Sequence, residues 1–116
     1  MRQYQIFRDR QKAMKLVKII YDASRIFPKE ELYGLTQQMR RAVVSIPSNL
    51  AEGAARNGAK EYAHFIGIAR GSRAEFDTQI QIAEMLGYRT YAESTTNTAE
   101  QVGRLLTGLY KKWSTA

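Results

Sequence analysis

The sequence predicts an all-α protein, an antiparallel up-down four-helix bundle whose second helix is kinked at Pro47. Apolar residues recur at helical spacing in four windows, the chain contains only two prolines, and the stretches between the windows are short. The 116 residues are expected to form a single domain over residues 1–116. A chain of this length supports one hydrophobic core, and each half alone would be marginal.

The first helix is predicted from about Asp9 to Arg25. Its apolar side carries Ala13, Leu16, Val17, Ile20, Tyr21 and Ser24, and Phe27 extends it. Pro28 ends the helix, because proline disfavours helical geometry in the residue before it. Residues 28–34 then form a connection.

The second helix is predicted from about Thr36, a suitable N-cap, to Arg56. One face carries Leu35, Met39, Ala42, Val43, Ile46, Leu50 and Gly53. An interior proline removes a helical hydrogen bond, so either two helices meet at Pro47 or one kinked helix runs through it. The apolar face keeps its angular position beyond Pro47, which favours one kinked helix.

The third helix is predicted from Lys60 to about Leu86, after the turn pair Asn57-Gly58. Its stripe is Tyr62, Phe65, Ile66, Ala69, Phe76, Ile80, Ala83 and Leu86. The fourth helix begins near Thr90 or Thr96, and Thr90-x-x-Glu93 fits a capping box, which makes the earlier start possible. Its apolar residues are Ala99, Val102, Leu105, Leu106, Leu109 and Trp113.

The side of the second helix opposite its core face is also apolar. A helix with that side in water is expected to place charged residues there. We therefore expect it to be covered, either by another copy of the chain or by a loop of the same chain. The candidate residues of an oligomer interface are Val44, Pro47, Ala51 and Ala55.

The third helix carries small residues, Ala63, Gly67 and Gly71, at a spacing of four. Glycine inside a helix costs roughly 1 kcal/mol relative to alanine, so two of them need a reason. Close packing between helices is one explanation. The close approach of a ligand or of a nucleic-acid backbone is the other.

The composition offers little for catalysis or metal binding. The chain has no Cys and a single His, His64, which excludes thiol catalysis and cysteine-based metal sites. Glu61-x-x-His64 matches half of the signature of carboxylate-bundle metal sites, but the second His is missing. We expect no catalytic residue, no metal, no cofactor and no small-molecule substrate, and therefore a protein that is not an enzyme.

The apolar runs are too short to cross a membrane, and the first residues do not resemble a signal peptide. These features predict a cytoplasmic protein without a membrane partner.

The chain is basic, with 18 Lys and Arg against 11 Asp and Glu and a net charge of +7. Residues 1–26 hold seven Lys and Arg against two Asp, or +5 of that total. Such a surface attracts phosphate backbones by releasing counterions, although it could also serve solubility alone. The candidate nucleic-acid contacts are Arg8, Lys12, Lys15, Lys18, Arg40, Arg41 and Arg56.

Nearly the whole chain resembles a known family. The resemblance rests on Phe27-Pro28-x-x-Glu31-x-Tyr33-Gly34-Leu35-Thr36-x-Gln38, on the run from Arg40-Arg41-Ala42-Val43-Val44-Ser45-Ile46 through Pro47-Ser48-Asn49-Leu50-Ala51-Glu52-Gly53, and on Glu61-Tyr62-x-x-Phe65 with Ile68-Ala69-Arg70-Gly71-Ser72-x-x-Glu75. These motifs are similar to those of the bacterial four helix bundle protein family, also called the 23S ribosomal RNA intervening-sequence protein family.

The resemblance implies an antiparallel bundle that assembles into a homopentameric ring and has no established enzymatic activity. It marks, beside Arg40, Arg41 and Pro47, a set of signature residues with a structural role: Ser45, Asn49, Glu52, Gly53, Gly71, Ser72 and Glu75. We expect an oligomeric protein that binds RNA or DNA through its basic surface. The alternative is a protein-only adaptor or scaffold ring, for example an accessory partner of a nucleic-acid enzyme.

Overall fold

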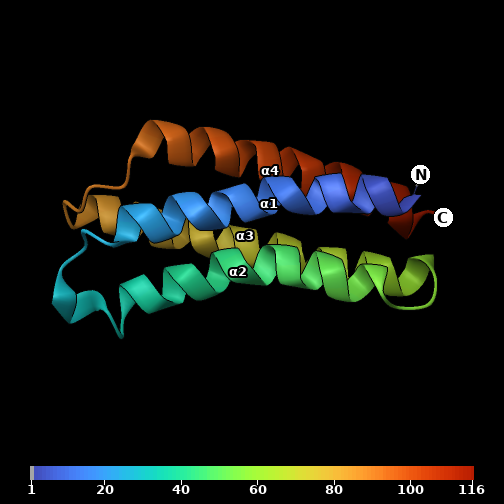
Figure 1. Ribbon diagram of the computed structural model, residues 1–116, viewed down its shortest axis with the longest axis horizontal. Helices are drawn as coiled ribbons and strands as arrows, with labels where there is room; N and C mark the ends of the chain where they lie inside the picture. The colour runs from blue at the N-terminus through green and yellow to red at the C-terminus, as the bar shows by residue number, and fades with distance from the viewer. Residues whose placement is uncertain (1) are drawn as a thin grey trace.

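The computed structural model describes the backbone of residues 2–116 and the side chains of residues 8–116. Its elements are α1 (Arg2–Ser24), the 3-10 turn η1 (Lys29–Glu31), α2 (Leu35–Ala54), α3 (Ala59–Met85) and α4 (Ala92–Ser114). The described residues contain no strand. The prediction of an all-α protein with four helices is therefore confirmed (Figure 1).

The helices lie side by side along the long axis of a body of 44 × 24 × 19 Å. Figure 1 shows both chain ends at one end of this body, together with the α2–α3 connection, and the other two connections at the opposite end. Helix α2 packs against α1 and α3, and α4 packs against the same two helices. Each helix therefore has two neighbours, as a bundle with one shared core requires.

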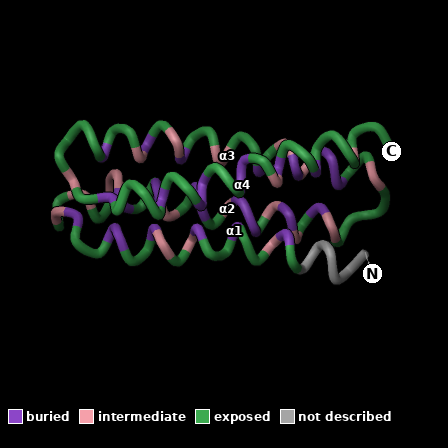
Figure 2. The backbone as a smooth tube through the Cα atoms, turned by 90° about the horizontal axis from the view of Figure 1, so that it is seen from above, coloured by how far each residue is buried: buried purple, intermediate pink, exposed green. Residues whose placement is uncertain are grey.

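The predicted apolar faces form that core. Met39, Val43 and Ile46 of α2 are fully buried with Leu16 and Ile20 of α1, and α3 and α4 complete the cluster. Figure 2 shows the buried positions recurring along the inner side of each helix. This recurrence follows from the 3.6-residue period of the helix.

Two residues of the predicted stripes are exposed. Leu86 is 54% exposed because α3 ends at Met85 and Leu86 is its C-cap. Tyr21 is 37% exposed because it lies at the edge of the α1 stripe, beside α2.

The helix starts differ from the predictions. Helix α1 begins at Arg2 and not near Asp9, since a helix can continue through polar residues without an apolar stripe. Helix α4 begins at Ala92 after Tyr91, which adopts the left-handed conformation with φ 51°. The capping box predicted at Thr90 is wrong, because the Thr90 hydroxyl donates a hydrogen bond to the Glu84 carboxylate at 3.2 Å instead.

The N-cap predicted at Thr36 is also wrong, because Gly34 takes that position and Thr36 is buried within α2. The Glu31 carboxylate caps the helix instead and accepts a hydrogen bond from the Leu35 backbone N–H at 3.3 Å. Its other oxygen accepts one from the Tyr88 hydroxyl at 2.7 Å, which raises the pKa of Tyr88. A carboxylate on the turn before the helix thus satisfies one of its free donors.

Helix α2 runs without interruption through Pro47, so one helix is present at this point and not two. Pro47 is buried inside its own protomer. Its assignment to an oligomer interface stays a prediction. Helix α2 lies between α1 and α3, so part of its second apolar side is covered within the chain.

Gly53 marks a close approach between helices, whereas Gly71 faces open space. A Cβ atom at Gly53 would lie 2.7 Å from Cβ of Phe65 and 2.9 Å from Cδ1 of Tyr62. The backbone of α2 at Gly53 therefore packs directly against these side chains of α3, with no room for a side chain of its own. The predicted small-residue row of α3 behaves differently. A Cβ at Gly67 would make an ordinary 3.6 Å contact with Tyr110, and one at Gly71 would meet no atom within 4 Å. Close packing within the protomer therefore does not explain Gly71.

Candidate nucleic-acid interface

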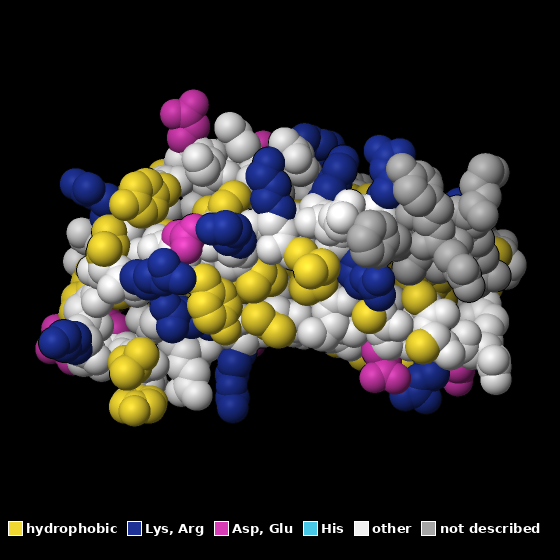
Figure 3. Space-filling model, in the orientation of Figure 1, with side chains coloured by type: hydrophobic (Ala, Val, Ile, Leu, Met, Phe, Trp, Pro, Cys, Tyr) yellow, Lys and Arg dark blue, Asp and Glu magenta, His cyan; other side chains and the backbone are white. Residues whose placement is uncertain are grey.

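Helix α1 turns a basic side away from the core. Its exposed cationic residues are Arg8, Lys12, Lys15 and Lys18. Together with Arg25, which follows the end of the helix at Ser24, they form what we name the α1 cationic face. They lie opposite the buried positions Ala13, Leu16 and Ile20 because the apolar stripe occupies the inner side of the helix. Figure 3 shows this region of the surface, where Lys and Arg side chains lie beside hydrophobic ones.

Part of this charge is paired. The Lys18 ammonium donates a hydrogen bond to the Asp22 carboxylate at 2.9 Å, and Nη1 of Arg25 lies 3.5 Å from the same side chain. The hydrogen bond from Lys18 is the main reason that the pKa of Asp22 lies below its ordinary value. Among the ion pairs of the described residues, none involves Lys12 or Lys15. These two lysines therefore carry the unpaired charge of the face.

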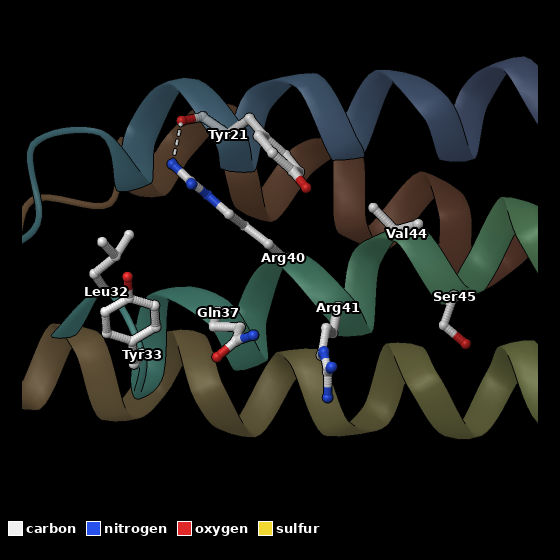
Figure 4. A pocket seen from close by; sticks show the side chains of 8 residues that line it. All are labelled: Tyr21, Leu32, Tyr33, Gln37, Arg40, Arg41, Val44 and Ser45. Atoms are coloured by element: carbon white, nitrogen blue, oxygen red, sulfur yellow. Dashed lines mark hydrogen bonds between the residues drawn. The ribbon is translucent and has the colours of Figure 1, made fainter.

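Arg40 is held between α2 and α1. Its Nε donates a hydrogen bond to the Ser24 hydroxyl at 2.9 Å, and Nη2 donates one to the Tyr21 carbonyl at 3.4 Å. Its guanidinium carbon lies 4.6 Å from the centroid of the Tyr21 ring. Figure 4 shows the two side chains extending toward one another from α2 and α1. Arg40 therefore has a fixed position and keeps its positive charge there.

The other two candidate arginines, Arg41 of α2 and Arg56 just beyond its end, differ in how far their charge is paired. Arg41 is exposed and borders the groove described below. Arg56 pairs with Glu52 at 3.0 Å and lies 5.1 Å from the centroid of Phe65. Glu52 neutralises Arg56 locally, so Arg41 is the more available contact for an anion.

A groove of about 520 Å³ lies between α1 and the start of α2. Its walls are Tyr21 of α1, Leu32 and Tyr33 of the turn before α2, and Gln37, Arg40, Arg41, Val44 and Ser45 of α2 (Figure 4). Tyr33 is 86% exposed, and no lining residue is acidic. Sequence reasoning missed this groove, although Tyr33, Gln37 and Arg41 follow one another at a spacing of four.

The signature residues link α2 to α3. Asn49 donates hydrogen bonds to the carbonyl and the hydroxyl of Ser45 at 2.8 and 2.9 Å, and the Ser45 hydroxyl lies 2.8 Å from that of Ser72. This hydrogen-bonded chain lies beside the close approach at Gly53 and fixes how the two helices meet. Of the remaining signature residues, Glu75 and Gly71 are exposed on α3.

The residues predicted for an oligomer interface lie in different places. Val44 is 38% exposed and opens into the groove, whereas Pro47 is buried. Ala51 is half-buried and Ala55 is exposed at the end of α2. Only the last two form a continuation of the exposed α2 surface beyond the groove.

The described part of the chain contains no group of three or more His, Cys, Asp and Glu residues able to hold a metal ion. His64 lies exposed on α3 with its ring centroid 5.3 Å from that of Phe65. None of the helices in the described residues is both long and apolar enough to cross a membrane.

Comparison with known proteins places this architecture in a family. A search of curated proteins found no match. The family model of the 23S rRNA-intervening sequence protein matches residues 7–108, a range that contains the whole of α2 and α3 and most of α1 and α4. The matched range includes the hydrogen-bonded chain of Asn49, Ser45 and Ser72 and the close contact of Gly53 with α3. The chain therefore belongs to the 23S rRNA-intervening sequence protein family.

Proposed function

We propose that this protein is a non-enzymatic, oligomeric bundle that binds the phosphate backbone of RNA or DNA in the cytoplasm. The observation that carries the proposal is the α1 cationic face, and above all the exposed, unpaired Lys12 and Lys15. Cationic side chains that neutralise phosphates release the counterions condensed on the nucleic acid, and this release favours binding without any base-specific contact. Arg41 extends the basic surface onto α2.

The proposal includes two finer features of the fold. The helices are antiparallel, which the alternation of the connections in Figure 1 supports. Helix α2 bends at Pro47, which is supported by the backbone donor that proline lacks. A bundle of this kind keeps α1 straight and its basic side continuous.

Self-association is the third part of the proposal. The exposed Ala55 and half-buried Ala51 support a contact between copies at the end of α2, and the homopentameric ring implied by the family resemblance is the assembly we favour. A ring would repeat the α1 cationic face around its circumference. Repetition strengthens electrostatic attraction, because several faces act on one polyanion.

The direct test of nucleic-acid binding is a salt titration of a fluorescein-labelled single-stranded RNA, followed by fluorescence anisotropy. If three to four phosphates are contacted, the affinity should fall roughly 20- to 50-fold between about 50 and 200 mM salt. A complete lack of binding at about 50 mM salt would refute the proposal. Binding that does not change with salt would show that phosphate contacts do not drive it.

The assembly has its own test. Ala55→Glu should give folded protomers of 13.3 kDa, because it places a charge in the proposed contact without touching the core. Light scattering coupled to gel filtration measures the mass, and circular dichroism checks the helices. Ala74→Glu, the same change at an exposed position of α3, is the control and should leave the mass unchanged. An unchanged mass for both variants would refute this interface.

A second candidate function, the protein-only adaptor, is favoured by one observation. A further groove, of about 730 Å³, runs between α3 and α4, and Gly67, Ile68 and Tyr110 are among its walls. Exposed apolar residues in a groove suit a protein partner. Capture of one defined protein, insensitive to nuclease and lost in an Ile68→Glu variant, would support this function over the first.

A further inference from the structure

The groove between α1 and α2 combines two properties, of which the phosphate-binding proposal uses only the positive charge. It is lined by aromatic side chains, Tyr21 and Tyr33, and by positive charge on Arg40 and Arg41 (Figure 4). Its volume of about 520 Å³ lies within the range of small-ligand pockets, roughly 300–1,000 Å³. The question is which ligand needs both properties in one place.

The charge in the groove is arranged for an anion. No lining residue is acidic, so nothing inside the groove neutralises Arg40 or Arg41. The bonds from Arg40 to Ser24 and Tyr21 hold its guanidinium in place before any ligand arrives. A fixed donor loses less entropy on binding than a mobile one, and guanidinium groups match the oxygens of phosphate.

The aromatic part of the groove is unusual. The Tyr33 ring is 86% exposed, although burying a tyrosine ring in the core would stabilise the fold. Figure 4 places it at one end of the groove, beside Leu32, while Tyr21 lies across from it on α1. Arg40 already covers the Tyr21 ring at 4.6 Å, so Tyr33 is the ring that remains open for stacking.

Aromatic rings beside a basic surface are the arrangement that single-stranded nucleic acids need. Their unpaired bases present a flat face to an aromatic side chain, and the backbone follows the charges. In a duplex the bases stack on each other and offer only their edges, so Tyr33 would find no partner there. The α1 cationic face adjoins the groove, because Lys18 and Arg25 flank Tyr21 at three and four residues along α1.

We propose that the α1–α2 groove receives an unpaired base of a single-stranded nucleic acid, with Tyr33 stacking on the base and Arg40 and Arg41 contacting the neighbouring phosphates. The inference rests on the proposed function and adds to it a substrate class, single-stranded over double-stranded. Ala51 and Ala55 lie further along α2, so the proposed contact between copies does not need the groove itself.

The test compares a labelled 12-nucleotide single-stranded RNA with a duplex that contains the same sequence, by anisotropy at about 50 mM salt. The single strand should bind more tightly to the unmodified protein. Tyr33→Ala should weaken single-strand binding roughly five- to 150-fold, the range measured for stacking of one base, and leave duplex binding unchanged. Tyr33→Phe, which keeps the ring, should restore the affinity.

A second readout separates stacking from charge. Tyr33→Ala removes no charge, so the slope of log affinity against log salt should stay the same, whereas Arg41→Gln should lower that slope by roughly 0.7 for a single strand. Tyr33 is exposed enough that its replacement leaves the fold intact, which circular dichroism would verify. Oligodeoxynucleotides of the same sequence show whether the groove distinguishes DNA from RNA.

Equal binding of single strand and duplex, together with no effect of Tyr33→Ala, would overturn this inference and leave backbone binding in place. Absence of binding to either RNA would overturn the proposed function and this inference with it. An equal loss with Tyr33→Ala and Tyr33→Phe would also contradict base stacking, because the phenylalanine ring stacks as well.

Discussion

Reversing the charge of Lys12 and Lys15 together is expected to weaken the binding of single-stranded RNA about 100-fold at about 50 mM salt. Two unit charges about 4 Å apart in water interact by about 1 kcal/mol, so replacing an attraction by a repulsion at two positions costs roughly 4 kcal/mol before salt screens part of it. The double variant Lys12→Glu/Lys15→Glu measures this by anisotropy. Both side chains are exposed, so the fold should be unaffected.

The matched control is Lys29→Glu/Lys60→Glu. It changes the net charge by the same amount at exposed positions on η1 and α3, outside the α1 cationic face. This control should lower the affinity by only a few-fold, through the overall charge of the molecule. Equal losses in the two double variants would show that net charge drives binding and that the α1 face is not the site.

Gly53→Ala is expected to lower the free energy of unfolding by about 1–2 kcal/mol. The added methyl group would lie 2.7 Å from Phe65 and 2.9 Å from Tyr62, so the two helices must separate or the rings must move. Overpacking of this kind costs about 1–3 kcal/mol, and the better helix propensity of alanine returns up to about 1 kcal/mol. Urea unfolding followed by circular dichroism at 222 nm gives the change.

Gly71→Ala is the control for the same chemical change. A Cβ at Gly71 meets no atom within 4 Å, so only the gain in helix propensity remains. Stability should then rise by up to about 1 kcal/mol. If Gly53→Ala also stabilised the protein, the close approach of α2 and α3 would be refuted. If Gly71→Ala destabilised it, Gly71 would have to pack against another molecule.

Most of the core could be predicted because each helix repeats the same local pattern. The stripe from Met39 to Gly53 in α2 and the run from Ala99 to Leu109 in α4 follow the helical period, and burial needs only that one side faces the other helices. The apolar face of α2 keeps its angular position on both sides of Pro47, and this predicted one helix through the proline, as the structure has it. Asn49 and Ser45 belong to the family motif that the sequence shows. Their hydrogen bonds explain their structural role, because they join α2 to Ser72 of α3.

The ends of the helices and the site were harder to predict. Thr36 and Thr90 fit local capping rules, but Glu31 and Tyr91 occupy those roles. The choice depends on which group the turn brings close, and a local rule has no access to that geometry. The position of Arg40 has the same origin, since its partners Ser24 and Tyr21 lie on another helix.

The helical class, the number of helices, the buried faces and the concentration of charge on the first helix all follow from the residue pattern alone. Those properties are periodic or compositional, so each depends on residues that are neighbours in the chain. The packing of the helices, in contrast, sets that Pro47 is buried, that Gly53 is a point of close approach while Gly71 is not, and that Tyr33 and Arg41 share a groove with Tyr21. These depend on distances between helices, and such distances are set by how all the side chains pack at once.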